Sequence, residues 1–425
     1  MIDINRIRNN KEEVEKALLK RMDNPNLDEL LILDTEKRKL GTKLDELRYE
    51  RKKVSDTVPE IKKNGGNADE IIKNMQDLGT EIDNGMIEYR VLEEKIFNFL
   101  SGLPNTPDDD ILGGGKENNE VVKTYLEKPE FNFKLISHDE ICRKLGLIDY
   151  ERGVKLGGTG SWIYTGIGAR LEWALINYFI DFHLRNNYQF MMIPYMLNYD
   201  CGFGAGQFPK FNDDVYWVDG FNNKDGKFLL PTAETGLVNL HSGEIMDIDD
   251  LPKKYFAFTQ CFRREAGSSR ADERGTIRGH QFNKVEIVQY VAEDNVKEAF
   301  NELLDKAETL VQSLGLHYQL SKLAAGDCAQ SMCRTYDIEV WIPSIERYIE
   351  VSSVSNSRDY QSRRNSTKYR DKEGKLQYAC TLNASGLATS RLIPAIVEQY
   401  QNEDGSITIP EVLRPYMGGK REISN

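Results

Sequence analysis

Residues 258–290, FTQCFRREAGSSRADERGTIRGHQFNKVEIVQY, form the stretch that decides the fold of this chain. Apolar runs flank a polar middle that contains glycine, and the second run alternates as a half-buried strand does. The stretch therefore predicts an antiparallel pair of strands joined by a long loop. Its cations are Arg263, Arg264, Arg270, Arg274, Arg278 and Lys284. Because guanidinium groups match phosphate oxygens with paired hydrogen bonds, this is a candidate phosphate site, with a solvated surface hairpin as the alternative.

Bulk composition sets the limits around this stretch. A chain of 425 residues fits two or three domains, and a net charge of −12 argues against a general nucleic-acid coat while permitting a local basic surface. No apolar run is long enough to cross a bilayer, and the charged first residues lack a signal peptide's apolar core. Six scattered cysteines without a CxxC pair predict reduced thiols and no structural zinc. We therefore expect a cytoplasmic protein.

Residues 27–100 predict a long helical hairpin. Leucine, valine and isoleucine recur every seven residues in the first half, at Leu33, Leu40, Leu47, Val54 and Ile61. The run Asn64-Gly65-Gly66-Asn67 breaks the helix, and apolar residues then return at three-and-four spacing. A short break makes the helices antiparallel, so we expect a coiled-coil arm. Gly85 occupies a position in the seam and is a predicted soft point.

The first helix of the arm carries a basic face. Its members are Lys37, Arg38, Lys39, Lys43, Arg48, Arg51, Lys52, Lys53, Lys62 and Lys63. By itself this face is also consistent with a solvated coiled-coil surface or with a strut that docks a protein. RNA binding is favoured only by the rest of the chain.

A Pro/Gly/Asp-rich linker follows, and it predicts a domain boundary near residue 112, between a helical arm (1–112) and a second domain (113–425). In the second domain a helix at 170–187 leads to a strand at 190–193. Short strands at 216–218, 227–230, 285–290, 338–341 and 348–352 favour a mostly antiparallel sheet and an α+β fold. A last helix at 391–401 follows a small, flexible segment at 383–388. The Gly166-Ile167-Gly168 run lacks a βαβ context, which argues against a dinucleotide fold.

These residues together resemble class II aminoacyl-tRNA synthetases, and among them the bacterial-type seryl-tRNA synthetases, over essentially the whole length. The helix and strand ending at Pro194 resemble motif 1. Residues 262–286 resemble motif 2, and Gly386-Leu387-Ala388 with Arg391 resembles motif 3. Further strings that resemble the serine-specific family are 206–211, 231–234, 280–286, 335–341, 350–353, 359–364 and 413–417.

The chain departs from the family pattern at four positions. Arg264 stands where serine is usual and Arg334 where lysine is usual; Ala205 replaces a threonine and Val354 a cysteine. The departures leave open a divergent paralogue that activates serine for another acceptor. A non-catalytic RNA-binding relic is a further alternative.

The resemblance implies ATP-dependent activation of L-serine to seryl-adenylate, followed by transfer to the 3′ end of serine tRNA; use of selenocysteine tRNA stays open. Arg263, Glu350 and Arg391 are the implied catalytic residues. The implied ATP-binding residues are Arg263, Arg264, Glu265, Phe282, Glu350, Val351, Ser352, Ser353 and Arg391. Glu350 and Ser353 would hold Mg²⁺, which prefers oxygen ligands and substrate phosphates.

The implied serine-binding residues are Thr232, Ala233, Glu234, Arg263, Glu286, Asn383 and Ser385. Glu286 is the choice for contacting both the hydroxyl and the ammonium group of serine, and its alternative is a salt-bridged sheet carboxylate paired with Lys284. The resemblance also implies a homodimer whose arm binds serine tRNA. The loop at 266–275 would meet the acceptor end of that tRNA.

Overall fold

A computed structural model describes residues 1–64, 69–218, 224–265 and 275–424. Contacts among these residues divide the chain into a smaller unit, residues 2–19 with 23–103, and a larger unit, residues 1, 20–22 and 104–425. The chain passes for the last time from the smaller to the larger unit after residue 103, whereas the sequence predicts a boundary near residue 112.

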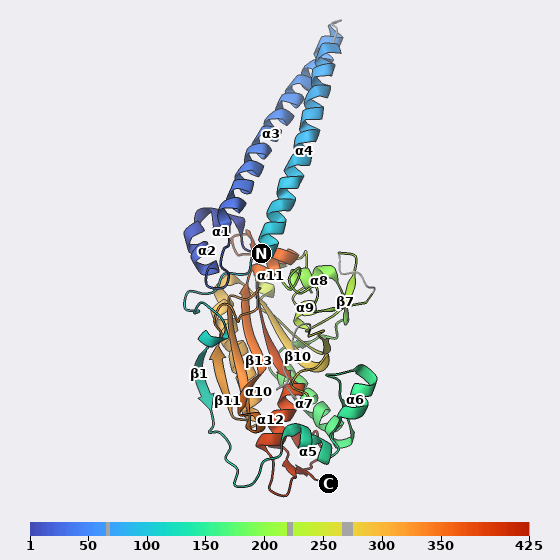
Figure 1. Cartoon of the computed structure of the whole chain (residues 1–425). Coiled ribbons are helices and arrows are strands. Elements are labelled where there is room, and N and C mark those ends of the chain that lie inside the picture. The colour runs from blue at the N-terminus through green and yellow to red at the C-terminus, as the bar shows by residue number, and fades with distance from the viewer. Residues whose placement is uncertain (65–68, 219–223, 266–274, 425) are drawn as a thin grey trace. The chain divides into compact units, whose positions relative to one another are not determined.

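The smaller unit is a helical hairpin with a short helical base. Its helices are α1 (Ile4–Asn9), α2 (Lys11–Leu18), α3 (Leu27–Lys63) and α4 (Asp69–Gly102). The long helices α3 and α4 run side by side (Figure 1), and the ion pairs Lys37–Glu93 and Lys43–Glu81 show that they are antiparallel. The predicted helical arm is confirmed.

Burial is concentrated at other positions of the arm than the predicted heptad residues Leu33, Leu40, Leu47, Val54 and Ile61, which are only partly buried. Leu44 of α3 is only 2% exposed, and the α4 residues Leu78, Ile82 and Leu92 are buried with it. Gly85 lies opposite Leu44, and a Cβ atom at Gly85 would come within 2.7 Å of the Leu44 Cδ2 atom. The glycine in the seam therefore makes room for a leucine of the facing helix.

An eight-stranded sheet organises the larger unit within the described residues, in the spatial order β1-β11-β12-β13-β16-β10-β9-β4. Its strands are β1 (Glu120–Tyr125), β4 (Gln189–Phe190), β9 (Lys253–Phe262), β10 (Gln281–Val291), β11 (Tyr318–Lys322), β12 (Arg334–Ile342), β13 (Arg347–Arg358) and β16 (Cys380–Ala388). Among these described strands, the β4–β9 pair alone is parallel. The predicted antiparallel pair is β9 and β10, and the α+β fold is confirmed.

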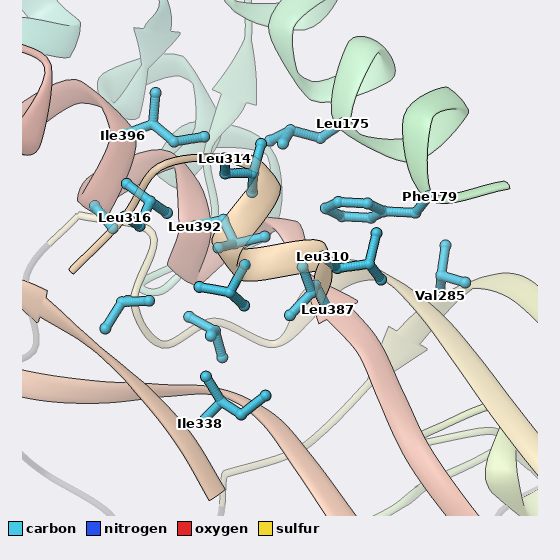
Figure 2. Packing of buried hydrophobic residues seen from close by; sticks show 14 of the residues in the cluster. Leu175, Phe179, Val285, Leu310, Leu314, Leu316, Ile338, Leu387, Leu392 and Ile396 are labelled. Carbon is cyan, nitrogen blue, oxygen red and sulfur yellow. The ribbon is translucent and has the colours of Figure 1, made fainter. Parts of the chain in front are cut away.

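Helices α7 (Gly166–Arg185), α10 (Val296–Ser313) and α12 (Thr389–Gln399) pack on this sheet. Figure 2 shows Leu175 and Phe179 of α7, Leu310 of α10, and Leu392 and Ile396 of α12 gathered around side chains of the strands. These helices are amphipathic, so burying their apolar faces against one side of the sheet forms the core. The core fixes the strands that carry the candidate site.

Shorter elements fill the connections. They are α5 (His138–Lys144), β2 (Ile148–Asp149), α6 (Tyr150–Gly157), β3 (Ile163–Tyr164), β5 (Met196–Asn198), α8 (Tyr199–Gly204), β6 (Tyr216–Trp217), β7 (Lys227–Leu229), α9 (Glu234–Leu237), β8 (Ile245–Asp247), α11 (Tyr360–Asn365), β14 (Lys368–Arg370), β15 (Leu376–Tyr378), β17 (Ile407–Thr408) and β18 (Glu422–Ile423). Of the helices in the described ranges, none is long and apolar enough to cross a membrane.

Sequence reasoning placed some boundaries wrongly. Residues 383–388, predicted as a flexible approach to the last helix, belong to β16, a buried inner strand. Small residues are needed there because both faces are covered: a Cβ atom at Gly386 would lie 2.7 Å from the His183 ring. Leu387 adopts a positive φ of 86°, where the pairing register with β10 shifts. The strand predicted at 190–193 is also shorter, since only Gln189–Phe190 pair as β4.

The structure accounts for Arg334, a departure from the family pattern. Its guanidinium donates from Nε to Asp108 (2.7 Å) and from Nη1 to Asp110 (3.0 Å). A planar fork can bind both carboxylates at once, which a lysine cannot do with the same geometry. Arg334 therefore anchors the segment that follows residue 104 to strand β12. Ala205 and Val354 are fully buried and make apolar contacts.

Candidate active site

A narrow cleft and a wide cleft adjoin in the larger unit. The narrow cleft, about 440 Å³, is lined by Arg263, Glu265, Ile277, Arg278, Gly279, Phe282, Lys284, Glu350, Val351, Ser385, Ala388, Ser390 and Arg391. The wide cleft, about 1060 Å³, is lined by Gly206, Gln207, Phe211, Asp214, Val215, Pro231, Thr232, Glu234, Arg263, Glu265, Arg278, Ala329, Gln330, Ser331 and Met332. Arg263, Glu265 and Arg278 belong to both linings, so the clefts meet at the end of β9.

Strand alternation explains which residues of β10 point toward the site. Phe282, Lys284 and Glu286 share one face of the strand, since successive side chains alternate. The Arg263 guanidinium lies over the Phe282 ring, 5.1 Å from its centroid, and its Nε donates to the Pro231 carbonyl at 3.3 Å. A cation and a flat aromatic face thus occupy the junction of the clefts. Such a pair suits a ligand with both a phosphate and a planar ring.

Glu286 is the centre of a buried polar network. It is 1% exposed and forms an ion pair with Lys284. Its carboxylate also accepts from Asn383 Nδ2 at 3.0 Å and from the Thr232 hydroxyl at 3.4 Å, while Lys284 Nζ donates to that hydroxyl at 2.7 Å. The Lys284 pair that sequence reasoning kept as the alternative is therefore present. It does not exclude ligand binding, because the same carboxylate stands between the residues predicted to bind serine.

Glu234 is a second carboxyl beside Glu286. Its oxygens accept from Gln361 Nε2 at 2.8 Å and from Asn383 Nδ2 at 3.2 Å. Burial, and then the negative charge of Glu286, raise the pKa of Glu234 to about 7. The neighbouring carboxyls therefore favour a ligand that brings a positive charge, such as an ammonium group.

Glu350 and Arg391 also line the narrow cleft. Arg391 Nη1 lies 3.2 Å from the Glu350 carboxylate and also donates to the Glu350 carbonyl at 2.9 Å. Burial by itself would raise the pKa of Glu350, but the charges of Arg391 and Arg263 outweigh it and lower the pKa below its ordinary value. Glu350 is thus held as a carboxylate facing the cleft.

The residues around Glu350 offer hard oxygen donors. Ser353 lies opposite Asp337 in the β12–β13 pair. Asp337 Oδ1 is buried and has no hydrogen-bond partner among the described residues. Across the same described residues, no three His, Cys, Asp or Glu side chains form a ready metal cage. This donor set fits Mg²⁺, which is held by one or two carboxylates together with substrate phosphates.

The structure separates several predicted site residues from the clefts. Arg264, predicted to bind ATP, donates to the Asp213 carbonyl at 3.1 Å and lines neither cleft. The Ser352 hydroxyl, also predicted to bind ATP, is buried and donates to the Ser385 carbonyl at 2.6 Å. Ala233, predicted to bind serine, packs in an apolar cluster. We therefore leave these side chains out of the proposed site.

The remaining predicted residues line the clefts or join the Glu286 network, except Ser353, which lines neither cleft. The structure also brings in Arg278 and Lys284, which sequence reasoning named only as cations of the stretch or as a partner of Glu286, and Gln361, which it gave no role. Glu265 forms an ion pair with Arg278, which lines both clefts. Lys284 forms the ion pair with Glu286 that sequence reasoning gave as the alternative. Gln361 carried no local signal, because it reaches Glu234 from a distant helix, α11. The loop predicted to meet tRNA, except Gly275, lies outside the described residues.

Comparison with known proteins agrees with this geometry. Residues 1–107 match the seryl-tRNA synthetase N-terminal domain, and residues 216–400 match the tRNA synthetase class II core domain (G, H, P, S and T). Serine--tRNA ligase 2 of Clostridium acetobutylicum is 54% identical over 98% of this chain and 99% of its own length. Serine--tRNA ligase of Carboxydothermus hydrogenoformans is 43% identical over 99% of each chain.

Solved structures show the same likeness. Seryl-tRNA synthetase from Pyrococcus horikoshii, complexed with ATP, superposes with a TM-score of 0.93 at 32% identity, covering 100% of this chain and 99% of that one. The cytoplasmic serine-tRNA ligase from Naegleria fowleri, in complex with AMP, gives a TM-score of 0.90 at 28% identity with the same coverage. The fold is therefore shared over both units.

Proposed function

Because the chain belongs to the seryl-tRNA synthetase family, we propose that it activates L-serine with ATP and transfers the seryl group to the 3′ end of serine tRNA. The observation that carries this proposal is that a site suited to a small amino acid adjoins a site suited to a nucleotide. The buried carboxyls Glu286 and Glu234 suit a small ammonium-bearing substrate, and they adjoin a cation-lined cleft that suits a nucleotide. The comparisons give no support to a non-tRNA acceptor or to a non-catalytic relic.

In the first step the carboxylate of serine attacks the α-phosphorus of ATP. A P–O bond to serine forms, the bond to the β-phosphate oxygen breaks, and pyrophosphate leaves with the electron pair. The serine carboxylate is ionised near pH 7, so this step needs no protein base. Arg263, at the junction of the clefts, would bind the α-phosphate together with the serine carboxylate. Its main contribution is positioning and charge stabilisation.

The narrow cleft is the proposed nucleotide site. Phe282 would stack on adenine, and Glu265 would accept from its amino group. Arg391 would bind the γ-phosphate or the second face of the base, at the side of the cleft formed by Glu350. Mg²⁺, held by Glu350 and Ser353, would supply positive charge to the phosphate oxygens.

The network around Glu286 is the proposed serine site. The proposed site consists of Glu286 together with Thr232, Glu234, Asn383 and Ser385. The polar groups of these residues would form hydrogen bonds with the hydroxyl and ammonium groups of serine. Alanine would leave buried polar groups unpaired, which is a strong penalty; threonine is rejected only by lack of room for one methyl group. In the second step the terminal ribose hydroxyl of tRNA attacks the activated carbonyl, and AMP leaves.

The partners proposed for the chain follow the same family logic. The arm, α3 with α4, would bind serine tRNA through phosphate and shape contacts, and two copies of the chain would form the working homodimer. Use of selenocysteine tRNA is included in the proposal as a second substrate to be tested. We propose the cytosol as its compartment.

Aminoacylation of total tRNA with labelled serine is the decisive experiment. We expect serine- and Mg²⁺-dependent exchange of pyrophosphate into ATP, together with labelled seryl-tRNA. Exchange without seryl-tRNA would instead favour a paralogue with another acceptor. Exchange supported only by a different amino acid would overturn the proposal.

A further inference from the structure

The buried carboxyl of Glu172 lies outside both clefts and joins helix α7 to β10 and α12, two elements that line the narrow cleft. Glu172 belongs to α7 and is only 3% exposed. Its Oε1 atom accepts from Asn283 Nδ2 of β10 at 2.8 Å and from the Thr389 hydroxyl of α12 at 2.5 Å. One oxygen atom therefore links the helix α7 to a strand and to a second helix.

Both donors stand next to residues that line the narrow cleft. Asn283 lies between Phe282 and Lys284, and strand alternation points its side chain to the opposite face of β10. Thr389 is the first residue of α12, two positions before Arg391. Glu172 thus contacts the two elements that carry Phe282 and Arg391, and both of these residues line the proposed nucleotide site.

Keeping a carboxyl at this position costs stability. The Glu172 Oε2 atom is buried and has no hydrogen-bond partner among the described residues. Burial raises the pKa of Glu172 to about 7, although the hydrogen bonds from Thr389 and Asn283 act in the opposite direction. A packed apolar side chain would avoid this cost. The hydrogen bonds that the Glu172 carboxyl accepts, and not a gain in stability, therefore explain why residue 172 is a glutamate.

We propose that Glu172 is a positioning residue that fixes the spacing of Phe282 and Arg391, and so sets the affinity for ATP without touching it. The inference rests on the proposed nucleotide site. It goes beyond that site because it assigns a role to a side chain that lies behind it, on a different helix.

The test measures the KM values for ATP and serine separately, by pyrophosphate exchange with the full chain. Removing the acceptor in Glu172→Leu is expected to raise the KM for ATP about tenfold, because two hydrogen bonds to the carboxyl can no longer form, and to leave the KM for serine within twofold. Glu172→Gln keeps an acceptor oxygen and should stay within threefold of wild type. Thr389→Val removes one donor at nearly constant volume, together with the 3.2 Å contact of that hydroxyl to the Asn283 carbonyl, and is the second variant if Glu172→Leu does not fold.

A matched control separates positioning from general stability. Glu308 is another buried acid, which accepts from the Tyr318 hydroxyl at 2.5 Å and from Lys123 at 2.7 Å, away from both clefts. Glu308→Leu should lower the melting temperature without changing the KM for ATP. Equal changes in both KM values for folded Glu172→Leu or Thr389→Val, or no change, would overturn the positioning role.

Variants of the site itself show which inference has failed. Phe282→Ala and Arg391→Ala should each raise the KM for ATP. If they do not, the proposed nucleotide site is wrong. If they do and Thr389→Val does not, the site stands and the role of Glu172 alone is refuted.

Discussion

Arg263 is the residue on which both proposed substrates converge. It lines both clefts, and its guanidinium already lies over the Phe282 ring. We predict that Arg263→Ala lowers the rate of pyrophosphate exchange by about 10²–10³-fold, the usual loss when one group that stabilises transition-state charge is removed. The measurement is kcat for exchange at saturating serine and ATP.

The control for this variant removes a similar cation elsewhere. Arg143 lies over the Tyr150 ring at 4.5 Å and lines neither cleft. Arg143→Ala should exchange pyrophosphate at the wild-type rate. An Arg263→Ala enzyme that kept wild-type kcat would show that the phosphate is bound elsewhere.

Glu234 makes the stability of the protein depend on pH. Its pKa is raised from 4.5 to about 7 in the folded state, first by burial and then by Glu286. Between these values the folded state keeps a proton that the unfolded state has released, so stability falls as pH rises through this window. Below pH 4.5 this contribution is fully present, and above about pH 7 it is gone. We predict that stability falls less steeply with rising pH in Glu234→Gln than in the wild type, because glutamine does not titrate.

Melting temperatures measured from about pH 5 to about pH 8, a range that spans the titration of the folded state, test this prediction. The wild type should lose more stability across the range than Glu234→Gln does, while replacement of the exposed Glu403 by Gln should leave the slope unchanged. The pKa of Glu172 is raised in the same direction, so a part of the slope should remain in Glu234→Gln. Parallel curves for wild type and Glu234→Gln would refute the prediction.

Local patterns in the sequence could identify part of the site. The alternation of Phe282, Lys284 and Glu286 predicts a shared face, and the structure confirms that face. Gln361 could not be paired with Glu234 in advance, because only the fold brings these distant segments together. Arg264 was predicted from its motif to bind ATP, but its side chain donates to the Asp213 carbonyl instead.

At the scale of elements, the long helices of the arm include one especially close contact. Gly85 of α4 admits Leu44 of α3, and a Cβ atom there would come within 2.7 Å of it. Replacing a glycine inside a helix by alanine normally raises the free energy of unfolding by about 0.5–1 kcal/mol. We predict that Gly85→Ala raises the free energy of unfolding by less than this amount, because the Leu44 side chain must move to make room for the new Cβ atom. Thermal unfolding of the wild type and the variant measures the difference.

Gly79 on the same helix provides the comparison. A Cβ atom at Gly79 would meet Arg51 atoms at 3.6 Å or more, an ordinary contact. Gly79→Ala should therefore show the full gain of about 0.5–1 kcal/mol. If Gly85→Ala were stabilised as much as Gly79→Ala, close packing at the seam would not be the reason for the glycine.

Elements with a strong period were predictable, and those shaped by tertiary packing were not. The helices α3 and α4 repeat their apolar residues over many turns, so their own sequence indicates them. Strand β16 contains small residues that are typical of a loop when read alone. Its conformation is imposed by β10 and β13 on either side and by helices above it, which no local pattern records.

At the scale of the whole molecule, activation and tRNA binding should be separable functions. The residues proposed for activation all lie in the larger unit, whereas the basic face lies on α3 of the smaller unit. Changes on α3 should therefore alter charging of tRNA and spare pyrophosphate exchange. Lys52 and Lys53 are suitable for this test because both are exposed on the helix.

We predict that the double variant Lys52→Gln/Lys53→Gln raises the KM for tRNA and leaves exchange unchanged. If both lysines bind phosphates, the slope of log affinity against log salt should become shallower by about one for each lysine replaced. The control is Lys73→Gln/Lys95→Gln, which removes exposed lysines from α4. An equal effect in the control would mean that net charge, and not the face of α3, attracts tRNA; unchanged charging in the α3 variant would reject tRNA binding by these lysines.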